Sequence, residues 1–198
     1  MAERSTQPER SPLVLASASP RRRWLLGNLG LVFEVSPADI DERPRSDELP
    51  EPYARRMAQE KAEAVAAAHA GSWLLAADTV VALGDAVLGK PRDDAEAASM
   101  LRRLSGEDHV VFTGVAIIDP EGSTAVSEVV ATSVRFRDLS DDDIQRYIAT
   151  GEPHDRAGSY AIQGEGAHLI DRVEGSYTNV IGLPVPEVVG WLRSCRVI

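Results

Sequence analysis

A turn rich in hydroxyl and guanidinium groups follows the first apolar run of the sequence. The stretch LVLASASPRRR, residues 13–23, passes from four apolar residues to two serines, a proline and three arginines. Pro20 is typical of the first position of a helix, and Ser19 is a typical N-cap before it. Because the N-terminus of a helix carries free N–H groups and partial positive charge, this turn is suited to bind an anion.

The arginines at the start of that helix need an explanation. Positive charge there opposes the helix dipole by about 0.3–1 kcal/mol per residue. Either the arginines are solvated and balanced by acidic neighbours, or they bind an anion. We favour a phosphate held by Ser17, Arg21 and Arg22, because hydroxyl, guanidinium and N–H groups all bind phosphate. The turn does not match a Walker A loop.

Carboxylates occur in two further places. Asp39, Asp41 and Glu42 lie in a long polar loop, and Asp78 follows an apolar run that we predict to be a strand ending there. Such oxygen ligands suit Mg²⁺ or Mn²⁺ if they converge, and triphosphate chemistry needs such an ion. The alternatives are a solvated acidic loop and a cap at the end of a strand.

Lysine, histidine and cysteine add less. Lys61 lies in an Ala-rich segment and Lys90 between a glycine and a proline, so each is either a surface lysine or a point charge near phosphate. His69 and His109 have no metal-ligand spacing and are expected to be structural or exposed. The single cysteine, Cys195, excludes a disulfide within the chain and a cysteine-based metal site.

The elements that must position these residues alternate between strands and helices. The patterns predict strands at residues 13–16, 32–36, 73–77, 79–83, 86–88, 109–119 and 123–137. They predict helices at residues 20–29, 53–70, 93–104, 140–150 and 184–193. Residues 151–182 are rich in glycine and are predicted to be a loop. This order predicts an α/β fold with a mixed, twisted sheet and flanking helices, antiparallel over residues 109–137.

The bulk composition narrows the class of protein. The chain has 198 residues and a formal net charge of −10. Such a charge disfavours a nucleic acid polymer as partner, but a local basic pocket can still bind a small anion. We find no apolar run of 18 residues and no signal-peptide pattern, so we expect a cytoplasmic globular protein without a membrane partner. Residues 1–11 are predicted to be a disordered polar tail.

From about residue 12 to residue 192 the sequence resembles the Maf family of nucleoside-triphosphate pyrophosphatases. Each matching block is weak alone, but the blocks follow the order of the family. They are 15-LASASPRR-22, 39-DIDE-42, 59-QEKA-62, 77-ADT-79, 89-GKP-91, 104-LSG-106, 113-TGVA-116, 151-GEPHDRAGSY-160, 162-IQG-164 and 174-EGSYTNVIGLP-184.

The resemblance implies an inosine-triphosphatase-like fold, with two lobes around a central cleft, in a single catalytic domain over residues 12–198. It implies hydrolysis of a nucleoside triphosphate between the α and β phosphates, which gives the monophosphate and pyrophosphate. It also implies a divalent metal cofactor, Mg²⁺ or Mn²⁺, and a homodimer.

The resemblance also assigns residues. The acidic and metal-binding positions of the family fall on Glu42 and Asp78. Its phosphate-contacting positions fall on Ser17, Arg21, Arg22, Lys61 and Lys90. Thr79 and Gln163 fall on positions associated with substrate recognition. We count Glu42, Lys61, Asp78 and Lys90 as catalytic, with Asp78 as the base that activates water.

The nucleotide preference follows from two positions. Arg21 directly after Pro20, together with Gln163, resembles the branch that acts on dTTP, UTP and modified pyrimidine nucleotides. The branch that acts on 7-methyl-GTP tends to carry an aromatic residue after that proline and an acidic residue in the later loop. Trp24 departs from the family, which often has a polar residue there.

Two other classes of function compete with this interpretation. The older family name, septum formation inhibitor, suggests a nucleotide-binding regulator of cell division without significant turnover. A pure binder would not need both Glu42 and Asp78. A polynucleotide-binding module is disfavoured by the charge and by the lack of interleaved basic and aromatic residues. The choice among dTTP, UTP, CTP and modified bases stays open, as does the choice between nucleotide-pool cleaning and division control.

Overall fold

The computed structural model describes residues 11–198, so all of the predicted polar tail except Ser11 lies outside the described residues. The strands are β1 (Leu13–Leu15), β2 (Glu34–Val35), β3 (Trp73–Leu83), β4 (Ala86–Leu88), β5 (Asp108–Ile118), β6 (Thr124–Phe136) and β7 (Ile170–Glu174). The α-helices are α1 (Pro20–Gly27), α2 (Pro50–Ala66), α3 (Asp94–Leu104), α4 (Asp141–Ala149), α5 (Tyr177–Ile181) and α6 (Val185–Ser194). Short 3-10 helices are η1 (Ala67–His69), η2 (Glu152–Asp155), η3 (Ala157–Ser159) and η4 (Gly164–Leu169).

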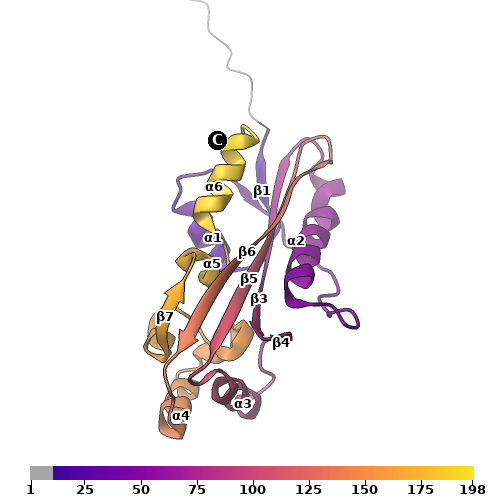
Figure 1. The fold of residues 1–198 in the computed structure, drawn as a ribbon. Coiled ribbons are helices and arrows are strands. Elements are labelled where there is room, and N and C mark those ends of the chain that lie inside the picture. The colour runs from indigo at the N-terminus through magenta and orange to yellow at the C-terminus, as the bar shows by residue number, and fades with distance from the viewer. Residues whose placement is uncertain (1–10) are drawn as a thin grey trace, which may run out of the picture.

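The strands form one mixed sheet, in the order β2-β1-β3-β5-β6-β7, with β4 paired to β3 (Figure 1). β1 runs parallel to β2 and β3, and every other pairing is antiparallel. The predicted α/β class with a mixed sheet and flanking helices is therefore confirmed, including the antiparallel pair β5 and β6.

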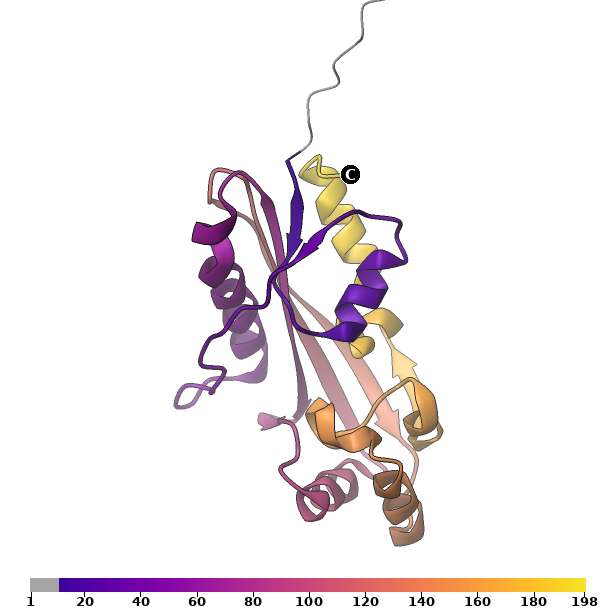
Figure 2. The same ribbon diagram turned by 180° about the vertical axis from the view of Figure 1, so that it is seen from behind.

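Helices cover both faces of the sheet. In the half of the molecule that holds β1, α1 and α6 lie on one face and α2 on the other (Figures 1 and 2). Alternate residues of β3 point to these two layers. Leu75 and Ala77 join the core beneath α1 and α6, whereas Leu74 and Ala76 join the core beneath α2. Burial on both faces explains why β3 reads as a continuous apolar run. α3 and α4 cover the opposite end of the molecule.

A gap in the pairing of β3 determines where the chain leaves the sheet. On one side β3 pairs with β5 from Leu74 to Ala82. On the other side β1 pairs with residues 73–75 and β4 with residues 81–83. Across the part of the chain that the structure describes, no strand pairs with residues 76–80 on that side. The last residues of β1 and β4 both border this gap, so the segments that follow them emerge there.

The strand prediction around Asp78 was wrong. β3 continues through Asp78, which pairs in register with Gly114 of β5, instead of ending before it. The side chain of Asp78 is ion-paired with Lys61, so its charge does not force the strand to end. The sequence pattern predicts two shorter strands because a charged residue inside an apolar run is typical of a strand end.

Other boundaries differ more mildly. Ser19 caps α1 as predicted and accepts a hydrogen bond from the N–H of Arg22, but α1 ends at Gly27, before the predicted Leu29. α2 begins at Pro50, three residues early, because proline is well tolerated in a first turn. The loop predicted for residues 151–182 contains η2, η3, η4, β7 and α5. Within residues 11–198, no helix combines the length and apolar character that crossing a membrane requires.

Candidate active site

A cavity of about 580 Å³ opens at the gap in β3. Its wall is built from the turn after β1, the start of α1, the loop before α2, α2 itself, the middle of β3 and the loop after β4. The segment from η2 to Gln163 and the end of α5 complete it. All of the residues to which the sequence analysis assigned a catalytic, metal-binding or substrate-binding role contribute to it. They are Ser17, Arg21, Arg22, Glu42, Lys61, Asp78, Thr79, Lys90 and Gln163. The structure brings these residues together, and their individual roles stay predictions.

Arg22 is the buried cation of this wall. Its Nε donates to the carbonyl of Gly182 at 2.8 Å, Nη1 to Ser17 Oγ at 3.3 Å and Nη2 to Thr79 Oγ1 at 3.0 Å. These acceptors are neutral, and no carboxylate among the described residues forms an ion pair with it. Burial lowers the pKa of Arg22, and the more distant Asp78 opposes this effect. The side chain is therefore held rigidly while its charge lacks a direct counter-ion.

Arg21 and Lys90 meet at a carboxylate that sequence reasoning missed. Lys90 Nζ lies 2.6 Å from Asp155 Oδ1, and Arg21 Nη1 lies 3.9 Å from Asp155 Oδ2. Burial lowers the pKa of Arg21, and Asp155 opposes this effect. Asp155 is the last residue of η2 and lies 134 residues after Arg21 in the sequence. Its only signal in the sequence was its membership of the block GEPHDRAGSY.

Lys61 joins two carboxylates. Its Nζ lies 2.6 Å from Asp78 Oδ1 and 2.9 Å from Glu42 Oε1. The side chains of Lys61 and Asp78 are 10% and 12% exposed, whereas that of Glu42 is 57% exposed. Asp78 Oδ2 makes no hydrogen bond within the described residues, although Asp78 lines the cavity. One oxygen of Asp78 is therefore fixed, and the other is available to a ligand or to water.

The close approach of α2 to the sheet makes this pairing possible. Gly114 lies opposite Asp78 in the ladder, beneath α2. A Cβ at this position would lie 2.1 Å from the carbonyl oxygen of Ala54, which is far inside van der Waals contact. Because Gly114 has no side chain, α2 packs backbone to backbone against β5. This packing brings Lys61 within reach of Asp78.

The acidic loop contributes one carboxylate instead of three. Asp41 pairs with Arg43 at 2.6 Å on the surface, and Asp39 does not line the cavity. Within residues 11–198, no group of three or more His, Cys, Asp or Glu side chains is arranged to hold a metal ion. Glu42 and Asp78 nevertheless converge on one point, now held by Lys61 Nζ. Such a pair fits Mg²⁺, which often uses one or two carboxylates together with phosphate oxygens.

The remaining predicted residues differ in their contacts. The hydroxyl of Thr79 accepts from Arg22 and lies 3.0 Å from Thr113 Oγ1, so it holds Arg22 in place. Gln163 lies on the cavity wall just before η4, and its side chain makes no cap hydrogen bond to that helix. An amide in that position can present both a donor and an acceptor to a ligand.

Two further cavity residues were not predicted, although Arg156 lies in the same block as Asp155. The hydroxyl of Tyr53 donates to the main-chain carbonyl of Glu42 at 2.5 Å. Arg156 carries Nε and Nη1 atoms that are buried with no hydrogen-bond partner among residues 11–198. The contact of Tyr53 does not follow from local sequence patterns, because it joins α2 to the loop that precedes it.

The family model and the curated relatives agree with one another. The profile of the family described as "Maf-like protein" matches residues 12–195. The chain is 55% identical over 181 residues to a dTTP/UTP pyrophosphatase of Myxococcus xanthus, covering 91% of each chain. It is 49% identical over 185 residues to a dTTP/UTP pyrophosphatase of Geobacter sulfurreducens, covering 93% of this chain and 97% of the relative. A solved structure of a nucleoside-triphosphatase, or dITP/XTP pyrophosphatase, from Mycobacterium abscessus aligns with 94% of this chain and 95% of its own, at 17% identity and a TM-score of 0.43.

Proposed function

Because this chain belongs to the Maf family, we propose that it is a pyrophosphatase that hydrolyses dTTP and UTP. The reaction breaks the bond between the α and β phosphates and releases the nucleoside monophosphate and pyrophosphate. The observation that carries the proposal is the convergence of five cations and three carboxylates on one cavity beside β3, where Glu42 and Asp78 share Lys61. The dTTP/UTP pyrophosphatases at about half identity support the choice of nucleotide. We extend the proposal to modified pyrimidine nucleotides.

The cations would bind the triphosphate. Arg22 has donors aimed by neutral partners and no ion-paired carboxylate in the described residues, so a phosphate is its natural counter-ion. Ser17 and the N-terminus of α1 add neutral donors beside it. Lys90 and Arg21 reach the cavity from other elements and would exchange the exposed Asp155 for phosphate oxygens.

We propose Mg²⁺ or Mn²⁺ as the cofactor. Glu42 and Asp78 would hold the ion, which would screen the phosphate charge and polarise the phosphorus centre. The fit rests on the two carboxylates that share Lys61 Nζ. Lys61 supplies positive charge at the same point and keeps the carboxylates close together in the free protein.

Asp78 is our candidate for the general base. Its Oδ1 is fixed by Lys61, and its Oδ2 can accept a proton from water. The oxygen of that water would attack the α phosphorus, the bond to the β phosphate would break, and pyrophosphate would leave. Because β3 and α2 hold the base and its partner rigidly, positioning supplies much of the expected rate enhancement.

Gln163 is the candidate reader of the base. Its carboxamide can accept from N3–H and donate to O4 of uracil or thymine. A buried hydrogen-bonding site of this kind rejects bases that leave its groups unpaired. Thr79 would act on the substrate through Arg22, whose position it fixes.

The test is a nucleotide panel assayed with Mg²⁺ or Mn²⁺, in which pyrophosphate and orthophosphate are resolved. We expect the monophosphate and pyrophosphate from dTTP and UTP. Asp78→Asn keeps the shape of the side chain but removes the base, so kcat should fall about 10²–10⁴-fold. Near-normal turnover in this variant would remove Asp78 from that role. Pyrophosphate release should also disappear when the divalent ion is chelated.

The competing function is a nucleotide-binding regulator of cell division. It would be favoured if dTTP bound without turnover under any metal condition. The convergence of Glu42 and Asp78 on Lys61 supports catalysis instead, because a pure binder does not need two carboxylates beside a triphosphate. A cytoplasmic location, a homodimer and the absence of a nucleic acid partner remain parts of the proposal.

A further inference from the structure

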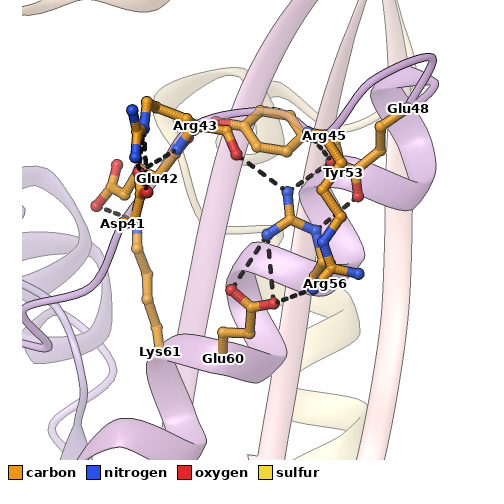
Figure 3. Close-up of polar contacts among 9 residues, drawn as sticks. All are labelled: Asp41, Glu42, Arg43, Arg45, Glu48, Tyr53, Arg56, Glu60 and Lys61. Atoms are coloured by element: carbon orange, nitrogen blue, oxygen red, sulfur yellow. Dashed lines mark hydrogen bonds and ion pairs between the residues drawn. The ribbon is translucent and has the colours of Figure 1, made fainter.

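The loop that carries Glu42, residues 36–49, is fastened to α2 by two side chains of that helix. We propose that Tyr53 and Arg56 are positioning residues, which hold this loop so that Glu42 lies against Lys61. Figure 3 shows both side chains between the loop and the helix. The inference deepens the proposed function and rests on it for the role of Glu42.

Tyr53 fixes the peptide of Glu42 itself. Its hydroxyl donates to the carbonyl oxygen of Glu42 at 2.5 Å, and the residue is 8% exposed. Burial raises the pKa of Tyr53 to about 12, and the nearby Asp78 and Glu42 add to this effect. The hydroxyl therefore stays protonated and remains a donor near neutral pH.

Arg56 fixes the next peptide and the far end of the loop. Its Nη2 donates to the carbonyl of Arg43 at 3.3 Å, while Nε and Nη2 bind both carboxylate oxygens of Glu48 at 2.6 and 2.5 Å. The side chains of Arg56 and Glu48 are 14% and 10% exposed, so this pair is largely shielded from water. Glu60, one turn further along α2, accepts hydrogen bonds from Nη1 of Arg56 at 3.3 and 3.1 Å (Figure 3).

The ion pair of Glu42 does not hold the loop by itself. Glu42 is 57% exposed, and exposed ion pairs contribute little to stability because water and salt screen them. Tyr53 and Arg56 instead donate hydrogen bonds to two successive main-chain carbonyls, those of Glu42 and Arg43. Lys61 follows Tyr53 by little more than two turns of the same helix. The single helix α2 therefore fixes the positions of both Glu42 and Lys61.

The chain offers a matched control for Arg56. Arg55 is its neighbour on α2, is also an arginine, and also donates to a main-chain carbonyl and pairs with acids. Its partners, Ser127, Glu51 and Glu128, do not line the cavity. Arg56→Gln and Tyr53→Phe should each lower kcat/KM for dTTP about tenfold, the size expected for one or two lost hydrogen bonds. Arg55→Gln should leave kcat/KM unchanged.

Amide hydrogen exchange on the free protein gives a readout that needs no activity. Exchange in residues 36–49 should accelerate in Tyr53→Phe and Arg56→Gln, and stay at the wild-type rate in Arg55→Gln. Equal exchange in all of these proteins would overturn the inference, even if the enzyme were active. If the wild type hydrolyses no nucleotide, the proposed function fails, and hydrogen exchange still decides the inference.

A double-mutant cycle separates positioning from general support of the fold. In the background of Glu42→Gln, Tyr53→Phe should cause no further loss of kcat/KM, because the residue it positions no longer contributes its charge. A full tenfold loss in that background would mean that Tyr53 acts by another route, which would contradict the proposal. For a wild type without turnover, dTTP binding replaces kcat/KM in the same cycle.

Discussion

Arg22 shows how a single residue can be prepared for a ligand. The partners that fix its guanidinium are a carbonyl and two hydroxyls, none of which cancels its charge. Arg21 and Lys90 instead share the exposed carboxylate of Asp155. The guanidinium of Arg22 is therefore already oriented to bind a phosphate. Arg21 and Lys90 must first break their ion pairs with Asp155. We expect Arg22 to contribute more to binding than the other two.

At Gln163 a single change should alter the choice of base. Gln163→Glu replaces the amide donor by an acceptor, which would repel O4 of uracil or thymine. kcat/KM for dTTP should fall about 10-fold or more, whereas CTP, which presents an amino group there, should be affected less. The measurement is the ranking of dTTP, UTP and CTP by kcat/KM. An unchanged ranking would place base reading elsewhere.

His109 should make the stability of the fold sensitive to mild acid. Its side chain is 1% exposed and lies against Phe136 and Tyr160, and burial lowers its pKa from 6.5 to about 4. Above pH 6.5 neither state takes up a proton at this group. Between pH 6.5 and about pH 4, His109 is protonated in the unfolded chain but stays neutral in the folded chain. The free energy of unfolding should therefore fall by about 2 kcal/mol between pH 7 and pH 5.

Urea unfolding at the two pH values measures this effect. His109→Gln keeps a polar partner for the hydroxyl of Tyr160 and does not titrate. Its overall stability should be lower, but the difference between pH 7 and pH 5 should shrink by about 2 kcal/mol. If the variant keeps the full pH dependence of the wild type, another group is responsible.

At this scale the sequence predicted residues better than contacts. Hydroxyl, guanidinium and carboxylate groups in recognisable blocks led to the residues that line the cavity. Their partners were not predictable in the same way. Asp155 and Tyr53 act through long-range contacts that only the folded chain creates, and neither lies in a local pattern with a distinctive chemical meaning.

Among the elements, α2 does most to shape the site. It supplies Lys61, it carries Tyr53 and Arg56, and it packs backbone to backbone over Gly114. Gly114→Ala would push a methyl group into the main chain of Ala54, so the helix must shift outward. The free energy of unfolding should fall by about 1–3 kcal/mol, the usual cost of overpacking. kcat should also fall, because Lys61 and Asp78 lie on opposite sides of this contact.

Gly190 of α6 provides the control for that substitution. A Cβ there would meet no atom within 4 Å. Gly190→Ala should therefore raise stability by about 0.5–1 kcal/mol, since alanine favours helix more than glycine does, and should leave kcat unchanged. Chemical denaturation and steady-state assays of both variants compare the two sites. Equal effects of the two substitutions would contradict the packing argument.

The elements were predictable where the local pattern and the tertiary structure agree. Caps at Ser19, Asp93 and Ser140 marked helix starts because their side chains bind the first free N–H groups. β7 was missed because its pairing with the end of β6 is set by the fold and its sequence, IDRVE, is mostly polar. The interruption predicted at Asp78 failed because Lys61, 17 residues earlier, compensates its charge.

On the scale of the whole molecule, a ligand should stabilise the fold. The cavity joins the turn before α1, the middle of β3, the loop after β4 and the segment around η2 and η3, which meet only in the native state. The non-hydrolysable α,β-methylene analogue of dTTP, with Mg²⁺, at 100 times its Kd should raise the Tm by about 5–10 °C. Differential scanning calorimetry measures the shift. Arg22→Ala should abolish most of it at the same ligand concentration, and a full shift in that variant would place the triphosphate elsewhere.

The gap beside residues 76–80 of β3 has a consequence for turnover. The floor of the cavity keeps its full ladder to β5, so distorting it would require breaking up the sheet. The rim is different, since Ser17 and Lys90 lie on segments that have left their strands and not yet reached a helix. Local opening of such segments needs only a fraction of the global unfolding free energy. The nucleotide can therefore enter, and the products leave, when the rim opens locally. Asp78 keeps its position meanwhile, because β3 stays paired with β5.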